Sequence, residues 1–134
     1  MIPRIADMLD GLELFSDFSY SELRTIARFV ALHSVKQGEV VFNEGDPGSN
    51  MLILVDGKLS VFKGGESGRH LLSSEGRGRI VGEMSLLDHE RRSATCVAES
   101  DCELLTLGAD GLERMAAEHP VLAYRFMYRL ARLL

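Results

Sequence analysis

Residues 51–62 read MLILVDGKLSVF, and this stretch indicates the fold class. Two apolar runs rich in β-forming residues, Met51–Val55 and Leu59–Phe62, stand on either side of Asp56-Gly57. A tight turn between two strands needs positive φ at its centre, a conformation that Gly adopts without strain. We therefore expect Asp56-Gly57 to join two strands as a hairpin.

Similar short runs continue on both sides of this stretch. They are separated by turn-forming residues, among them Gly38, the segment 45–48 and Gly64-Gly65. The further runs lie at Val35, 40–42, 71–73, 80–81, 94–98 and 103–107. Short strands with regular turn signals predict a mainly β fold, an antiparallel jelly-roll barrel (double-stranded β-helix) over about 31–108.

Helical patterns flank the strands. Over about 4–30, a stripe of apolar residues is followed by Ser19 and Glu22, whose spacing predicts a capping box. Over about 110–134, one short helix ends before Pro120 and a second runs from Val121 to Leu134. The apolar stripe of that last helix consists of Leu122, Phe126, Leu130 and Leu133. We expect a single domain over 1–134, with helices, barrel and helices in that order.

Composition narrows the class of function. The 134 residues are 46% hydrophobic and carry a net charge of −5, which disfavours binding to nucleic-acid phosphates. Cys96 and Cys102 in a chain of this size favour a reducing compartment, and no signal peptide or membrane-length apolar run is evident. We expect a cytoplasmic protein that is not an enzyme, with no cofactor, no metal, no membrane partner and no nucleic acid bound by this chain alone.

The segment 81–98 interrupts the strand pattern, and it contains two adjacent arginines. If a strand resumes at Ser93, period-2 alternation places Arg92 on the same face as the small residues Ala94, Cys96 and Ala98. Arg91 then faces outward. A buried guanidinium without an anion costs several kcal/mol by order of magnitude, so we expect a negative group to meet Arg92.

Two interpretations of that negative group stay open on chemistry alone. Glu83 could pair with Arg92 and brace a turn, or both side chains could contact one ligand. Ser85–Leu87 is long enough for about one helical turn after Gly82, and free N–H groups at a helix start attract anions. The second interpretation predicts a ligand with one anionic group and one hydroxyl, such as a sugar phosphate or a cyclic nucleotide.

The two segments 82–86 (GEMSL) and 92–95 (RSAT) resemble the phosphate-binding cassette of the cyclic nucleotide-binding domain family. That family includes catabolite-activator-type regulators and the regulatory subunits of protein kinase A. The nine-residue step from Glu83 to Arg92 is similar to the kinase subunits, and segments 38–46 and 57–59 resemble the family's glycine pattern. The likeness covers roughly 12–134. Arg91 replaces a common Pro, and the added charge at Arg77 and Arg79 either attracts an anion or is solvated; we expect the latter.

The resemblance implies a role for each site residue. Glu83 accepts a hydrogen bond from the ribose 2′-hydroxyl, Arg92 pairs with the cyclic phosphate, and backbone N–H groups complete the phosphate cradle. The expected ligand-binding residues are Gly82, Glu83, Met84, Ser85, Arg92, Ser93, Ala94 and Leu72. A Ser93 hydroxyl is compatible with cAMP and with cGMP, and we favour cAMP.

The resemblance also suggests how the last helix acts. In the family this helix pairs two subunits or moves over the base as a lid, so we expect a homodimer through 122–134 and movement of this helix on binding. Because the chain stops at Leu134, we expect an incompletely capped base and no DNA-reading element. The alternatives are a degenerate scaffold or dimerisation domain without ligand, which the presence of both Glu83 and Arg92 disfavours, and a cupin-type metalloenzyme, whose histidine motif is missing.

Overall fold

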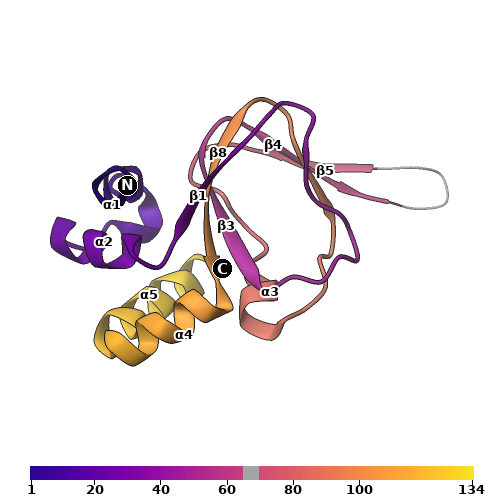
Figure 1. Cartoon of the computed structure of the whole chain (residues 1–134). Helices are drawn as coiled ribbons and strands as arrows, with labels where there is room; N and C mark the ends of the chain where they lie inside the picture. Colours follow the sequence, from indigo (N-terminus) through magenta and orange to yellow (C-terminus); the bar gives the residue numbers. More distant parts are fainter. Residues whose placement is uncertain (65–69) are drawn as a thin grey trace. The chain divides into compact units, whose positions relative to one another are not determined.

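The computed structural model describes residues 1–64 and 70–134 (Figure 1). Gly65, expected to mark a turn together with Gly64, lies outside the described residues. The chain forms two compact units, one made of Leu32–Thr106 and the other of Met1–Ala31 with Leu107–Leu134.

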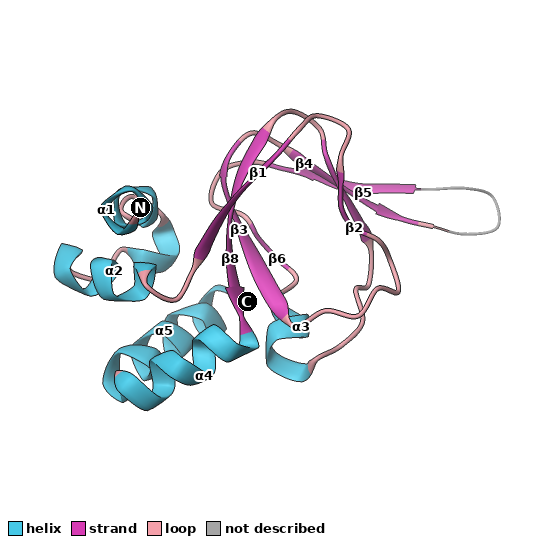
Figure 2. Cartoon of the chain, in the orientation of Figure 1, coloured by secondary structure: helices cyan, strands magenta, loops and turns pink. Residues whose placement is uncertain are grey.

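Most strands match the runs expected from the sequence with differences of one or two residues at their ends, whereas the first strand begins four residues before the expected Val35. The strands are β1 (Ala31–Val35), β2 (Val40–Phe42), β3 (Asn50–Asp56), β4 (Leu59–Lys63), β5 (His70–Glu75), β6 (Ile80–Val81), β7 (Thr95–Ala98) and β8 (Cys102–Gly108). A short helix, α3 (Glu83–Asp88), stands between β6 and β7. Within the described residues these strands form two four-stranded sheets, ordered β1-β8-β3-β6 and β2-β7-β4-β5 (Figure 2). The expected jelly roll is confirmed, although the hydrogen-bonded ladders of the described strands do not close into one barrel.

The Asp56-Gly57 turn differs from expectation. Gly57 does have positive φ (+96°), but β3 pairs with β6 and β4 pairs with β5 and β7, so the two runs lie in different sheets. The hairpin prediction is therefore wrong, and the turn is a corner between sheets. A Cβ at Gly57 would lie 2.3 Å from the Asp101 carbonyl oxygen, so the corner also needs glycine for close packing.

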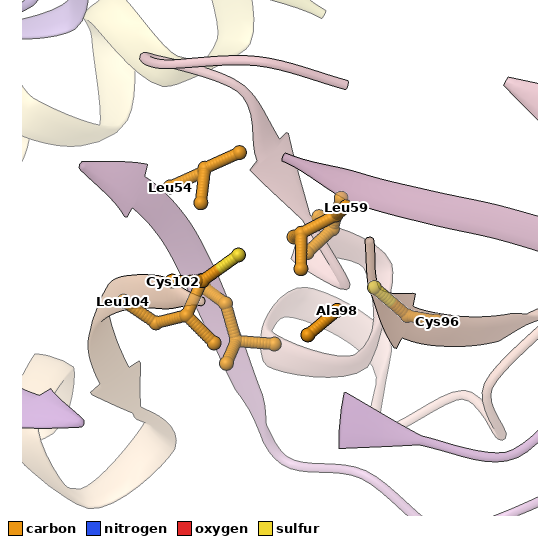
Figure 3. Packing of buried hydrophobic residues seen from close by; sticks show 8 residues of the cluster. Leu54, Leu59, Cys96, Ala98, Cys102 and Leu104 are labelled. Atoms are coloured by element: carbon orange, nitrogen blue, oxygen red, sulfur yellow. The ribbon is translucent and has the colours of Figure 1, made fainter. Parts of the chain in front are cut away.

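The core of Leu32–Thr106 lies where the inward faces of both sheets contribute side chains. Figure 3 shows this packing of leucines, alanine and the two cysteines. The cluster comprises Leu52, Leu54, Leu59, Val81, Cys96, Ala98, Cys102 and Leu104. Burial raises the pKa of the Cys96 thiol to about 12, so this side chain stays neutral and packs as a small apolar group.

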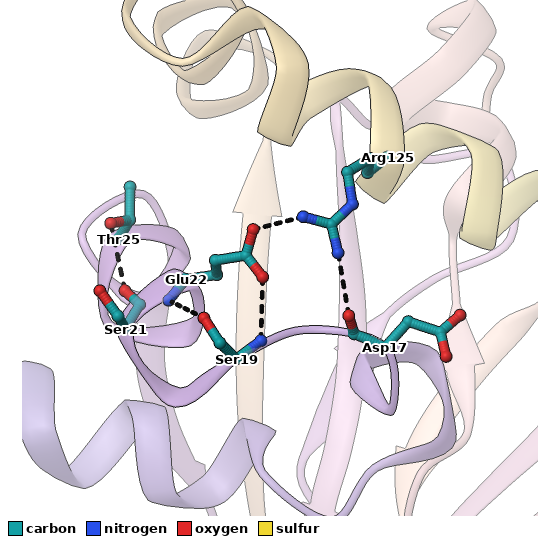
Figure 4. Close-up of polar contacts among 6 residues, drawn as sticks. All are labelled: Asp17, Ser19, Ser21, Glu22, Thr25 and Arg125. Atoms are coloured by element: carbon teal, nitrogen blue, oxygen red, sulfur yellow. Dashed lines mark hydrogen bonds and ion pairs between the residues drawn. The ribbon is translucent and has the colours of Figure 1, made fainter.

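The helical unit contains α1 (Ile2–Leu9), a 3₁₀ turn η1 (Glu13–Phe15), α2 (Tyr20–Ala27), α4 (Ala109–Glu118) and α5 (Pro120–Leu133). The capping box at the start of α2 is confirmed, because Ser19 Oγ accepts from Glu22 N–H at 3.2 Å and Glu22 accepts from Ser19 N–H at 2.9 Å. Figure 4 shows Arg125 of α5 reaching the same Glu22 and the Asp17 carbonyl oxygen. These contacts tie α5 to the start of α2.

The apolar stripe of α5 is covered within the chain. Phe126 is 1% exposed and its ring stacks with that of Phe15 at 6.0 Å between centroids, while Leu122 and Leu130 are also buried. The prediction that these three residues form the surface of a homodimer is therefore wrong, because they belong to the core of the helical unit. Only Leu133 of the predicted stripe is exposed.

In the part of the chain that the structure describes, no helix combines the length and the apolar character needed to cross a membrane.

Candidate functional site

Backbone hydrogen bonds join the loop after β2 to the segment before β7. Gly45 N–H donates to the Arg92 carbonyl and Arg92 N–H donates to the Asp46 carbonyl, both at 2.8 Å. Glu44 N–H donates to Thr95 Oγ1 at 2.9 Å. These bonds hold the backbone of Arg92 in one place, so its side chain starts from a well-defined position.

The side chain of Arg92 is buried, with 8% of the residue exposed. Its Nη2 donates to Asn50 Oδ1 at 2.5 Å, and its Nη1 donates to the carbonyl oxygens of Asn50 at 3.0 Å and Gly82 at 3.4 Å. The guanidinium also lies 4.5 Å from the centre of the Phe42 ring. All these partners are uncharged. Burial lowers the pKa of Arg92 and the nearby Asp46 carboxylate opposes that shift, but the guanidinium remains a cation.

Two glycines make room for this guanidinium. A Cβ at Gly82 would lie 2.1 Å from Arg92 Nη1, and a Cβ at Gly48 would lie 2.5 Å from Arg92 Nε. Gly82 also has φ of +75°, which disfavours other residues. The close approach of the backbone at Gly82 thus results from the packing of Arg92.

Both arginines have the orientation that period-2 alternation predicts. Arg92, Ala94, Cys96 and Ala98 are buried, while Arg91 and Ser93 are exposed. However, β7 begins at Thr95 rather than at Ser93, and Thr95 is buried although alternation places it outside. Its hydroxyl is drawn inward by the hydrogen bond from Glu44 N–H described above. Arg91 Nη1 donates to the Gly45 carbonyl at 2.9 Å.

The helical turn expected at Ser85–Leu87 is present as α3, which packs beside β3. Gly82 is its N-cap, and the first N–H groups of a helix have no partner four residues back. Ser85 Oγ donates to the Glu90 carbonyl at 2.7 Å, which ties the helix to the loop that follows. His89 ends the helix in the left-handed region with φ of 55°.

Glu83 is the first residue of α3 and is half-buried. None of the hydrogen bonds or ion pairs found within residues 1–64 and 70–134 joins Glu83 to Arg92. In this structure, therefore, Arg92 is held by Asn50 and Gly82, and the carboxylate of Glu83 is left to face the cavity described next.

A cavity of about 300 Å³ opens beside Arg92. Its lining contains seven of the eight expected ligand-binding residues, namely Gly82, Glu83, Met84, Ser85, Arg92, Ser93 and Ala94. Pockets of this size hold small organic ligands. Because its walls combine a buried cation, a carboxylate and apolar side chains such as Phe42 and Val61, the cavity can hold a molecule with an anionic group, a hydroxyl and an apolar ring.

Leu72 is the exception. It is 57% exposed and does not line the cavity, whereas Ser73 and Glu75 of the same strand do. The pairing of β4 with β5 shifts register here, since Val61 is opposite Ser73 and Phe62 is opposite Leu71. Leu72 is the extra residue of this bulge, which has no partner opposite it in β4.

Sequence reasoning missed Asn50, Gly48 and Phe42. Gly48 stood in a segment that reads as an ordinary turn, and Asn50 simply precedes an apolar strand, so neither carried a distinct signal. Arg79 is exposed, as expected for a solvated side chain, and its Nε also lies 3.3 Å from Glu75 Oε2, with both residues lining the cavity.

Comparison with known proteins adds to this geometry. A model of the cyclic nucleotide-binding domain family matches residues 32–119. A cyclic AMP receptor protein of Thermus thermophilus is 32% identical over 125 residues, which is 92% of this chain and 58% of that protein. A cAMP-dependent protein kinase regulatory subunit of Aspergillus niger is 34% identical over 107 residues, covering 80% of this chain and 26% of the subunit.

A solved structure is also similar. The cyclic nucleotide-binding domain from Methylobacillus flagellatus aligns with a TM-score of 0.86 and 31% identity, covering 98% of this chain and 75% of that one. The matched part of the chain corresponds to 58% of the length of the Thermus protein and 26% of the length of the Aspergillus subunit.

Proposed function

This chain belongs to the cyclic nucleotide-binding domain family, and from that premise we propose that it is a regulatory module that binds a cyclic nucleotide in the cavity beside Arg92, with cAMP favoured over cGMP. In this proposal the chain binds its ligand and does not catalyse a reaction.

The observation that carries the proposal is the state of Arg92. Its guanidinium is buried, yet its hydrogen-bond partners are neutral oxygens of Asn50 and Gly82. A buried charge is stabilised chiefly by an opposite charge, and a guanidinium has donors left after these three bonds. A cyclic phosphate supplies one negative charge and two exocyclic oxygens, and so satisfies both requirements.

The remaining contacts follow from the lining of the cavity. Among the described residues the Glu83 carboxylate has no hydrogen-bond or ion-pair partner, and in this proposal it accepts a hydrogen bond from the ribose 2′-hydroxyl. Backbone N–H groups around Gly82, Glu83 and Ser93 surround the phosphate in this proposal, whereas Ser85 N–H already donates to the Gly82 carbonyl at 3.1 Å. Met84 and Ala94 are apolar neighbours. The buried Ser85 hydroxyl already donates to Glu90, so its role is to hold the cradle in shape. Leu72, which does not line the cavity, is given no contact in this proposal.

The preference for cAMP rests on the relatives named above, two of which carry cyclic AMP in their names. The exposed Ser93 hydroxyl is compatible with either nucleotide, because it could also bond the 2-amino group of guanine. A calorimetric preference for cGMP that disappears in Ser93→Ala would reverse this part of the proposal.

Three further parts of the proposal concern how the module works. Ligand binding is coupled to movement of α5, the protein forms a homodimer through the exposed side of that helix, and it acts in the cytoplasm. Two free buried thiols, Cys96 and Cys102, fit a reducing compartment. Hydrogen exchange of α5 with and without ligand tests the coupling, since unchanged exchange would contradict it.

Calorimetric titration with cAMP, cGMP and cyclic di-GMP tests the binding function itself. We expect saturable 1:1 binding of cAMP, weaker binding of cGMP and none of cyclic di-GMP, which is too large for a cavity of about 300 Å³. Absence of binding to all three nucleotides would contradict the proposal and favour a scaffold role.

A further inference from the structure

Glu75 and Arg79 form an ion pair on the wall of the cavity. Arg79 Nε lies 3.3 Å from Glu75 Oε2, and the two side chains are 58% and 20% exposed respectively. Both residues line the cavity. An exposed ion pair contributes little to stability, so its position in a binding cavity calls for an explanation other than bracing a turn.

The backbone of Arg79 is held by its neighbours. Arg79 N–H donates to the Gly76 carbonyl at 3.2 Å, and the Arg79 carbonyl accepts from Leu54 N–H at 2.9 Å. Gly78 N–H donates to the Leu54 carbonyl at 2.7 Å. Glu75 is likewise held in the ladder, opposite Leu59. The pair therefore presents its polar atoms from an anchored strand and turn.

The sheet register places Glu75 away from the Arg92 end of the cavity. Glu75 is opposite Leu59, which is opposite Ala98, so Glu75 and Ala98 are two strand spacings, or about 9–10 Å, apart across the sheet. Arg92 precedes Thr95, which is itself about 10 Å along β7 from Ala98. The α-carbons of Glu75 and Thr95 are thus roughly 14 Å apart, and Arg92 lies three residues before Thr95, so Glu75 and Arg92 can contact opposite ends of an elongated ligand.

The pair offers a mixed hydrogen-bond edge. The single contact leaves Glu75 Oε1 as an acceptor and the Arg79 Nη groups as donors. Adenine has a donor beside acceptors, with its 6-amino group next to N7 and N1. Guanine presents two acceptors, O6 and N7, on the corresponding Hoogsteen edge, which would set O6 against the carboxylate. Guanine's N1–H and O6 edge does carry a donor and an acceptor, but in the opposite order.

Resting on the proposed function, we propose that Glu75 and Arg79 are the base-reading pair of this chain: Glu75 accepts from the adenine 6-amino group and Arg79 donates to an adjacent ring nitrogen. Because Arg79 offsets the charge of Glu75, this carboxylate does not repel a phosphate bound beside Arg92. The ligand class selected is a 6-aminopurine cyclic nucleotide.

The test compares cAMP, cGMP and the cyclic 3′,5′-monophosphate of purine riboside, which lacks the 6-amino group. Wild-type protein should bind cAMP about tenfold more tightly than the purine analogue, as expected for a hydrogen bond to a charged acceptor. In Glu75→Ala that ratio should fall to about one through loss of cAMP affinity alone. The matched controls Glu39→Ala and Arg77→Ala change exposed residues outside the cavity and should keep the wild-type ratio.

A charge swap separates base reading from turn bracing. The double variant Glu75→Arg, Arg79→Glu keeps the ion pair and reverses the order of donor and acceptor, so its preference should move towards cGMP. Because the readout is a ratio of affinities on one sample, partial unfolding does not alter it. If the swap behaves as wild type, or if Glu75→Ala weakens all three ligands equally, the pair only braces the turn and the inference fails. If wild-type protein binds none of the three, or Arg92→Ala leaves binding intact, the proposed function fails instead.

Discussion

Asn50 holds the guanidinium of Arg92 with two oxygens: Oδ1 accepts from Nη2 at 2.5 Å and the carbonyl accepts from Nη1 at 3.0 Å. Asn50 is the first residue of β3, whose following residues lie in the core. The strand thereby positions a cation without neutralising it. A carboxylate in the same place would compete with any anionic ligand, whereas an amide leaves the positive charge available.

This relationship makes a prediction for Asn50→Asp. The new carboxylate should form an ion pair with Arg92, so the affinity for cAMP should fall at least tenfold while thermal stability is kept or raised. Asn50→Ala should instead lower stability, because it removes one hydrogen bond from a buried cation. Calorimetry and thermal unfolding of the two variants measure both effects, and a full-affinity Asn50→Asp protein would contradict the account.

Replacing Arg92 by Ala should weaken cAMP binding by roughly 1.5–3 kcal/mol, because a charge-assisted hydrogen bond to phosphate is lost. Arg91→Ala is the matched control. Its guanidinium is exposed and bonded to the Gly45 carbonyl, so most of the affinity should remain. If the Arg91 variant loses binding and the Arg92 variant keeps it, the assignment of the phosphate ligand is reversed.

The role proposed for Glu83 predicts discrimination against a missing hydroxyl. Wild-type protein should bind 2′-deoxy-cAMP less tightly than cAMP by about tenfold, and Glu83→Ala should bind both nucleotides alike. Competition titration measures the two ratios. Equal affinity of wild-type protein for the two nucleotides would remove the ribose contact from the proposal.

Glu22 gives the helical unit a pH-dependent stability. The backbone N–H of Ser19, together with Arg125, lowers the pKa of Glu22 in the folded protein. A lowered folded pKa stabilises the protein above the unfolded value of about 4.3, and this contribution is lost as pH falls through the folded pKa. Glu22→Gln should therefore lower stability at pH 7 by up to about 1 kcal/mol, and match wild type at pH 2–3.

Chemical denaturation at several pH values checks this prediction. Glu113→Gln, on the exposed surface of α4, is the control and should follow wild type throughout. A Glu22→Gln defect that persists unchanged at acid pH would show that shape, rather than charge, is what the variant loses.

The proposed homodimer depends on the outer side of α5. Tyr124 is 69% exposed and stacks on Tyr128 at 6.3 Å, with Val121 exposed one turn earlier. Tyr124→Glu should turn a dimer into a monomer in sedimentation velocity at micromolar concentration, while Ala117→Glu on α4 should not. Phe126→Glu cannot be used, because that residue is in the core. Wild-type protein that is already monomeric would contradict the dimer.

The positions of strands and helices, and the inward orientation of Arg92, can be predicted from the amino-acid sequence. Strand positions follow from period-2 apolar runs between turn residues, the start of α2 from the Ser19 and Glu22 spacing, and the burial of Arg92 from its alternation with Ala94 and Cys96. Each of these signals is local, because it depends on backbone geometry within a few residues.

The partners of these elements follow instead from the three-dimensional packing of the chain. It separated the strands on either side of Asp56-Gly57 into two sheets, put Asn50 rather than Glu83 against Arg92, and removed Leu72 from the cavity by a bulge. It also covered Phe126 with Phe15. These outcomes depend on residues far apart in the chain, and a periodic pattern states that a face is buried without stating which distant segment buries it.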